Sequence, residues 1–127
     1  MIFAVAQVWS KHSLLNTRKP IVSAINGAAV GVGLALALLA DVPIAARTAK
    51  FFDGHVRIGV AAGDHAALIW PLLCGMAKSK YFLLTNEPMT GEAAERNNLA
   101  ALAVDIEELA AKSISVEEKI ANSAPTA

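Results

Sequence analysis

Residues 19–33 read Lys-Pro-Ile-Val-Ser-Ala-Ile-Asn-Gly-Ala-Ala-Val-Gly-Val-Gly, and this stretch decides the fold. Its first part, Ile21–Ile25, is rich in apolar and β-branched residues and predicts a short strand that is buried on both faces, as in a parallel sheet. Asn26 and Gly27 end that strand, and the small residues as far as Val32 predict a loop. A short apolar helix is expected to follow, to about Ala40.

The rest of the chain continues to alternate strands and helices. A second buried strand is predicted over Val42–Ala46 and a last one over Leu99–Val104. Helices are predicted over Phe3–Leu15, Ala66–Trp70, Ala77–Leu84, Gly91–Asn97 and Ile106–Asn122, with Asp64 and Thr90 as N-caps, Pro71 as an interruption and Gly75 as a stop. This order predicts an α/β fold with parallel pairing, and residues 1–127 contain no linker that would divide them into two domains.

Composition excludes several classes of protein. Hydrophobic residues make up 55% of the chain and charged residues 17%, so either the core is large for the chain or, as we expect, apolar surface faces a partner. Eleven basic and eleven acidic residues offer no field for nucleic acid. The single cysteine, Cys74, excludes a disulfide framework and favours a reducing, cytoplasmic setting. The apolar run over 21–40 is broken by its strand and turn, so no membrane span is predicted.

The glycine-rich turn after the first strand does not match a nucleotide-binding motif. The dinucleotide pattern G-x-G-x-x-G fails because Leu36 stands at its third glycine, and no G-K-[ST] sequence is present. Small residues before a helix leave two interpretations. Either they only allow close packing, or their backbone N–H groups face a developing oxyanion.

A wider pattern of motifs resembles a known family. Residues 19–33 run on to Leu38-Leu-Ala-Asp41, and further motifs follow in the same order over 49–64, 70–73, 83–96 and 99–105. This series is similar to the central part of the crotonase superfamily of enoyl-CoA hydratases and isomerases. The resemblance implies a repeated ββα spiral, assembled as a homotrimer or a dimer of trimers. It also implies that residues 1–127 are a partial core, incomplete at both ends, without the upstream oxyanion loop and the C-terminal helices.

The resemblance also implies a site. Family members polarise a thioester carbonyl with two backbone N–H groups, of which one corresponds here to Val32, in place of the usual glycine. Ala28 and Gly31 belong to the same oxyanion and substrate-binding segment, and the other donor comes from a loop upstream of it. Coenzyme A enters as part of the substrate, so no separate cofactor is expected.

The two glutamates with which family hydratases activate water fall on Ala35 and His55. Hydration by a glutamate pair is therefore not expected. His55 and Asp64 instead resemble the His–Asp arrangement of family members that cleave carbon–carbon bonds in β-diketones. A histidine titrates near neutral pH and serves as a general base when a carboxylate fixes its tautomer. The structural alternative is that Asp64 only caps a helix and His55 lies on a surface strand beside Arg57.

Two further side chains are weaker candidates. His65 follows Asp64 and is a second possible base, while Arg57, two residues after His55 on the predicted strand, would share its face and meet a phosphate or carboxylate. A third ligand that would make a metal site is not identifiable. We therefore expect an enzyme that acts on an acyl-CoA or a related carbonyl substrate, and hydration, thioester hydrolysis and retro-Claisen cleavage stay open. The alternative is a non-catalytic fragment that serves as an oligomerising module.

Overall fold

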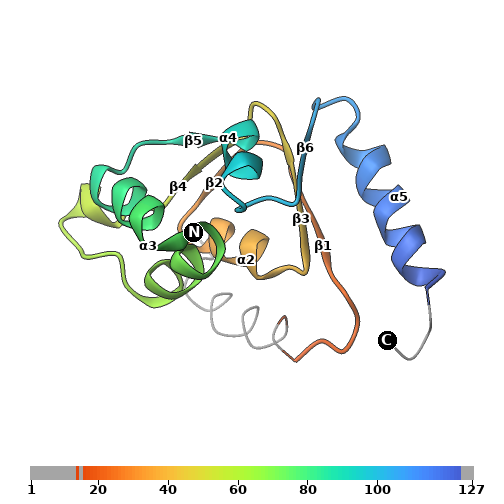
Figure 1. Cartoon of the computed structure of the whole chain (residues 1–127), viewed down its shortest axis with the longest axis horizontal. Helices are drawn as coiled ribbons and strands as arrows, with labels where there is room; N and C mark the ends of the chain where they lie inside the picture. The colour runs from red at the N-terminus through yellow and green to blue at the C-terminus, as the bar shows by residue number, and fades with distance from the viewer. Residues whose placement is uncertain (1–13, 15, 124–127) are drawn as a thin grey trace.

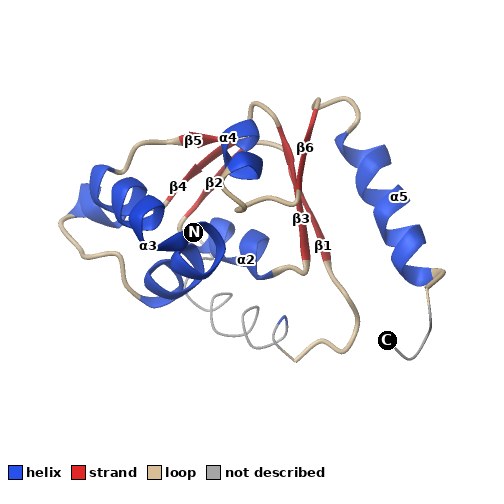
Figure 2. Ribbon diagram, in the orientation of Figure 1, coloured by secondary structure: helices blue, strands red, loops and turns tan. Residues whose placement is uncertain are grey.

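The computed structural model describes residue 14 and residues 16–123, except for the side chains of Asp64 and His65. The helix expected at the N-terminus lies almost wholly outside these residues. Two three-stranded sheets form the framework (Figure 2). The first sheet has the order β1 (Val22–Ile25), β3 (Val42–Ala46), β6 (Leu102–Val104), and the second has the order β2 (Ala28–Val30), β4 (Lys50–Phe52), β5 (Met89–Thr90).

Both sheets are formed by one repeated unit of two strands and a helix. A strand of the first sheet, a strand of the second sheet and then a helix follow one another, first as β1, β2 and α2 (Val32–Leu39), then as β3, β4 and α3 (Asp64–Thr85). A 3₁₀ helix, η1 (His55–Ile58), precedes α3. β1 pairs with β3 and β2 pairs with β4, both in parallel. The predicted α/β class, with parallel pairing and ββα order, is confirmed.

Helices cover both faces of the first sheet. α5 (Leu109–Ala121) packs on β1 and β3 from the outside, where Figure 1 shows it in blue. On the other face α2 contacts β1, and α4 (Gly91–Arg96) contacts β3 and β6. The second sheet lies beyond these two helices, beside α3 (Figure 1). The two sheets are therefore held together by the core between them.

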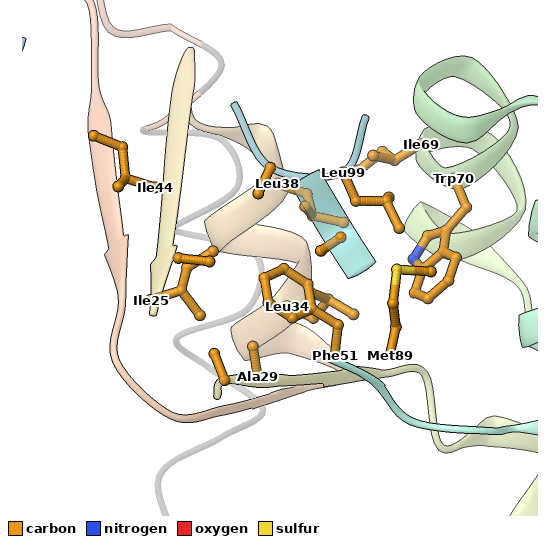
Figure 3. Close-up of a cluster of buried hydrophobic side chains, with 14 of the residues drawn as sticks. Ile25, Ala29, Leu34, Leu38, Ile44, Phe51, Ile69, Trp70, Met89 and Leu99 are labelled. Carbon is orange, nitrogen blue, oxygen red and sulfur yellow. The ribbon is translucent and has the colours of Figure 1, made fainter. Parts of the chain in front are cut away.

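That core brings the two sheets and the first half of α3 together (Figure 3). Its largest fully buried side chains come from five elements and the turn after α4, and include Trp70, Phe51, Leu34, Ile44, Met89 and Leu99. Burial of one such side chain stabilises a fold by about 1.5–3 kcal/mol, so this cluster fixes the position of β4 and of the turn that follows it.

Three strands differ from the sequence-based expectation. The loop predicted over 26–32 contains β2, and β5 was not predicted at all. Both are short and get their strand geometry from pairing with β4, which a local pattern does not reveal. The last strand begins at Leu102, not at Leu99, because a turn precedes it in which the Ala101 N–H bonds the Pro43 carbonyl.

α3 also differs from the prediction. Its N-cap is Gly63, so Asp64 is the first helical residue and not the cap. The predicted interruption at Pro71 is wrong, because Pro71 lies inside the helix, whereas the predicted stop at Gly75 is confirmed, because its φ of 77°, which suits only glycine, breaks α3 there. The predicted cap of α4 is confirmed, since the Thr90 side chain accepts the Ala93 N–H at 3.1 Å. α5 begins at Leu109, three residues after the predicted start.

The outer face of α3 carries exposed apolar side chains. Leu68 and Leu72, one turn apart, are exposed before the break at Gly75, and Met76 and Leu84 are exposed after it. Cys74 on the same helix is a free, half-buried thiol, and burial raises its pKa. No helix in the described part of the chain is both long and apolar enough to cross a membrane. The expectation that the chain contacts a partner stays a prediction.

Candidate active site

Two turns lie next to each other at one edge of the second sheet. Gly31 and Val32 follow β2, and Asp53 to His55 follow β4. β2 and β4 are parallel, with Val30 opposite Phe52, so their carboxyl ends meet at the same edge, where α/β folds bind ligands. A Cβ placed on Gly31 would lie 4.0 Å from the Asp53 carbonyl oxygen. The two turns are therefore in contact.

The first turn presents backbone N–H groups at the start of α2. Gly31 is the N-cap, with φ 52° and ψ −119°, a conformation that excludes most other residues. Its carbonyl accepts the Ala35 N–H at 2.9 Å and begins the helix. Within the described residues the Val32 N–H makes no hydrogen bond, as expected for the first residue of a helix. Ala28 lies earlier, on β2, with its side chain exposed.

The second turn holds a histidine against a buried carboxylate. His55 Nδ1 lies 2.6 Å from Asp53 Oδ2, and the same oxygen accepts the His55 backbone N–H at 3.2 Å. The Asp53 side chain is 1% exposed, whereas that of His55 is 25% exposed. When the neutral ring donates its Nδ1–H to Asp53, the lone pair is on Nε2. The arrangement is that of a histidine oriented to act as a base.

A third residue fastens the turn between Asp53 and His55. Gly54 has a left-handed φ of 87°, and its N–H donates to Asn86 Oδ1 at 3.0 Å. Asn86 is buried at the C-terminal end of α3. Asp53 Oδ1 and Asn86 Nδ2 are also buried and make no hydrogen bond within the described part of the protein. A buried polar group without a hydrogen bond costs free energy of folding, so such groups are rare in proteins, and two of them lie at this turn.

Arg57 does not share a face with His55. Both belong to η1, not to a strand, and about 120° per residue separates successive side chains in a 3₁₀ helix. The Arg57 guanidinium lies over the Phe52 ring, 5.6 Å from its centroid. The expectation that Arg57 and His55 point the same way, and that His55 lies on a surface strand, is wrong.

The remaining sequence candidates divide into two groups. Ala35, at the first glutamate position, is fully buried in α2 and offers no acid or base. Asp64 begins α3, which contacts η1, but the Asp64 and His65 side chains lie outside the described atoms. The His55–Asp64 pair therefore stays a prediction. No group of three or more possible metal ligands occurs among the described residues.

Comparison with known proteins identifies the family. The sequence profile of the enoyl-CoA hydratase/isomerase family matches residues 3–127. The chain belongs to this family. Its sequence is 40% identical over 107 residues to the (E)-benzylidenesuccinyl-CoA hydratase of Thauera aromatica, covering 84% of this chain and 42% of that protein. It is 33% identical over 111 residues to a probable mitochondrial enoyl-CoA hydratase of Dictyostelium discoideum, covering 87% and 40%.

Solved structures of enoyl-CoA hydratases and isomerases show the same fold. A probable enoyl-CoA hydratase/isomerase from Mycobacterium abscessus superposes with a TM-score of 0.83 at 29% identity, covering 91% of this chain and 45% of that one. An enoyl-CoA hydratase from Mycobacterium tuberculosis gives 0.78 at 32% identity, covering 84% and 48%. This member of the family thus has the crotonase fold and spans about half the length of the structures it matches.

In this member of the enoyl-CoA hydratase/isomerase family, two residues of the site, Asp53 and Asn86, were not predicted from the sequence. Asp53 stands only two residues before His55, and the left-handed Gly54 between them is the signal that such a short spacing folds back on itself. Asn86 follows a helix, where a left-handed asparagine is common. Its contact with Gly54, 32 residues away, leaves no trace in a local pattern.

Proposed function

We propose that this protein acts on an acyl-CoA thioester or a related carbonyl compound, with the Val32 N–H as an oxyanion donor and His55 as the base that activates water. The contact that carries the proposal is the 2.6 Å approach of His55 Nδ1 to buried Asp53, at the edge where the Val32 N–H makes no bond in the described chain. Family membership supplies the substrate class, because the relatives named above are hydratases of CoA thioesters.

Each group has one role in the proposed reaction. The Val32 N–H, at the positive end of α2, lowers the energy of the negative charge that develops on the carbonyl oxygen. His55 Nε2 takes a proton from water as water attacks the carbonyl or a conjugated carbon. Asp53 keeps the ring in the Nδ1–H tautomer and stabilises the imidazolium that forms. Val32 needs only its backbone for this role, so its side chain does not remove the donor.

The histidine also permits two related reactions. Water activated by His55 and directed at a thioester carbonyl would hydrolyse it, and directed at a β-diketone it would give retro-Claisen cleavage. In both, the oxyanion forms at the same donor. The substrate screen that tests the proposal therefore contains enoyl-CoA thioesters, saturated acyl-CoA thioesters and cyclic β-diketones, and is run on the protein as its gene encodes it. The proposal expects turnover in at least one class.

Crotonyl-CoA is expected to be a poor substrate. Family hydratases use two carboxylates on one water, whereas this chain has fully buried Ala35 and the imidazole of His55 in those positions. Loss of one positioned acid or base lowers a rate by about 10²- to 10⁴-fold. The measurement is the decrease in enoyl-CoA absorbance, beside a hydratase that has both glutamates as the control. Turnover at the rate of that control would contradict the assignment of the site.

A second candidate function rests on the apolar face of α3. Leu68 and Leu72 are exposed one turn apart before the break at Gly75, and Met76 and Leu84 are exposed after it, which suits contact with a neighbouring chain. We propose on this ground that the protein is a homo-oligomer, a trimer or a dimer of trimers. If the substrate screen finds no turnover while the oligomer forms, the chain is a non-catalytic oligomerising module.

A further inference from the structure

We propose that Asn86 is a positioning residue for His55. It acts through the backbone of Gly54, whose N–H it holds at 3.0 Å from its side-chain oxygen. The catalytic consequence of this role rests on the function proposed above, whereas its effect on the His55 ring does not.

The turn between Asp53 and His55 decides whether their side chains meet. Asp53 Oδ2 accepts both the ring Nδ1–H and the backbone N–H of His55, so the carboxylate and the imidazole meet only while the chain folds back at Gly54. Gly54 adopts a left-handed φ of 87°, but a glycine occupies several other backbone conformations just as readily. The local sequence does not hold the turn in one state. A bond from outside the turn is needed for that.

The role of Asn86 as a helix cap does not require an asparagine side chain. Asn86 ends α3 with a left-handed φ of 52°, and its backbone N–H caps the helix by donating to the Phe82 carbonyl at 2.9 Å. A glycine would make the same cap with no side chain at all. The amide is nevertheless buried, and its Nδ2 makes no hydrogen bond within the described part of the chain. Capping does not explain a buried amide, whereas the bond to Gly54 does.

The same chain contains an asparagine that serves as a matched control. Asn98 also has a left-handed φ, 63°, but its side chain is exposed and it ends the turn after α4. Its backbone N–H donates to the Glu95 carbonyl at 3.0 Å. Asn98→Gly therefore removes an amide from the same backbone conformation without touching the turn at Gly54.

The test compares Asn86→Gly and Asn98→Gly with the wild type by nitrogen-15 NMR of the histidine rings. The signals of His55 are assigned by their loss in His55→Ala. In the wild type we expect His55 to be held as the Nδ1–H tautomer and the Gly54 amide to exchange slowly with solvent. In Asn86→Gly we expect a mixture of both tautomers and an exposed Gly54 amide. Asn98→Gly should match the wild type in both measurements.

The outcomes separate this inference from the proposed function. Unchanged His55 ring signals in a folded Asn86→Gly protein would overturn it. A Gly54 amide that exchanges rapidly in the wild type would also overturn it, and this measurement needs no variant. On a substrate that the wild type turns over, kcat of Asn86→Gly should fall by about 10- to 100-fold, with KM unchanged. If no substrate is turned over, the proposed function fails, while the NMR result still decides the role of Asn86.

Discussion

The His55→Ala variant is expected to lose between about two and four decades of kcat on the substrate that the wild type turns over, the usual contribution of a general base. The imidazole is the partly exposed group at the edge of the second sheet, and buried Asp53 orients it from a distance of 2.6 Å. The change leaves the buried Asp53 carboxylate without the imidazole, so the variant should also be less stable, and its folding is checked by circular dichroism at the assay temperature. A variant with full activity would exclude His55 as the base.

Two aspartate variants show which carboxylate orients the ring. Asp53→Asn keeps the shape of the side chain but replaces the carboxylate with a neutral amide, which does not stabilise the imidazolium and whose N–H groups can favour the other tautomer, so its loss of rate should approach that of His55→Ala. Asp64→Asn is the matched comparison at the start of α3. Asparagine suits a helix start about as well as aspartate, so neither folding nor stability should confuse the result. If Asp64 orients the ring, as the sequence predicts, Asp64→Asn should lose catalytic rate as well.

The Gly91→Ala variant is expected to be destabilised by more than about 3 kcal/mol, the upper end of the usual cost of overpacking. A Cβ at Gly91 would lie 1.9 Å from the Ala46 carbonyl oxygen and 3.2 Å from the Ala45 Cβ. Both atoms belong to β3, the central strand of its sheet, and a backbone oxygen there has no room to rotate away. Chemical denaturation followed by circular dichroism measures the loss.

Gly33→Ala is the control for this effect. Gly33 is also a helical glycine, in the first turn of α2, but a Cβ there meets nothing within 4 Å. Alanine is favoured over glycine in a helix by roughly 1 kcal/mol, so this variant should be as stable as the wild type or slightly more so. Equal stability of Gly91→Ala and Gly33→Ala would show that α4 does not pack on β3 as closely as described.

Much of the fold was predictable because its main elements carry strong local signals. Val42–Ala46 and the helix over 32–39 are continuous apolar runs bounded by turns, and the structure places both where the sequence predicts them. β2 and β5 lack such signals. They are three and two residues long, and they are strands only because they pair with β4. Pairing between distant segments is the part of a fold that a local pattern does not encode.

The candidate site shows the same limit. The sequence singled out His55 and Val32 through the family resemblance, and the structure places them on two turns that touch. It did not reveal the contact with Asp53, because it placed His55 on a strand beside Arg57 and paired it with Asp64. The left-handed Gly54 turns the chain back and brings the imidazole to Asp53.

The central claim is that a carbonyl oxygen binds to the Val32 N–H, and the carbonyl stretching frequency of a bound acyl-CoA tests it most directly. Val32 is the first residue of α2, a position that tolerates proline, so Val32→Pro removes the N–H while the helix remains, whereas Val32→Ala keeps it. Isotope-edited infrared difference spectra should show a lower frequency in the wild type and in Val32→Ala than in water. Val32→Pro is expected to lose this shift, together with about 10²- to 10³-fold in kcat. A wild-type frequency equal to that in water, or a shift that survives in Val32→Pro, would contradict it.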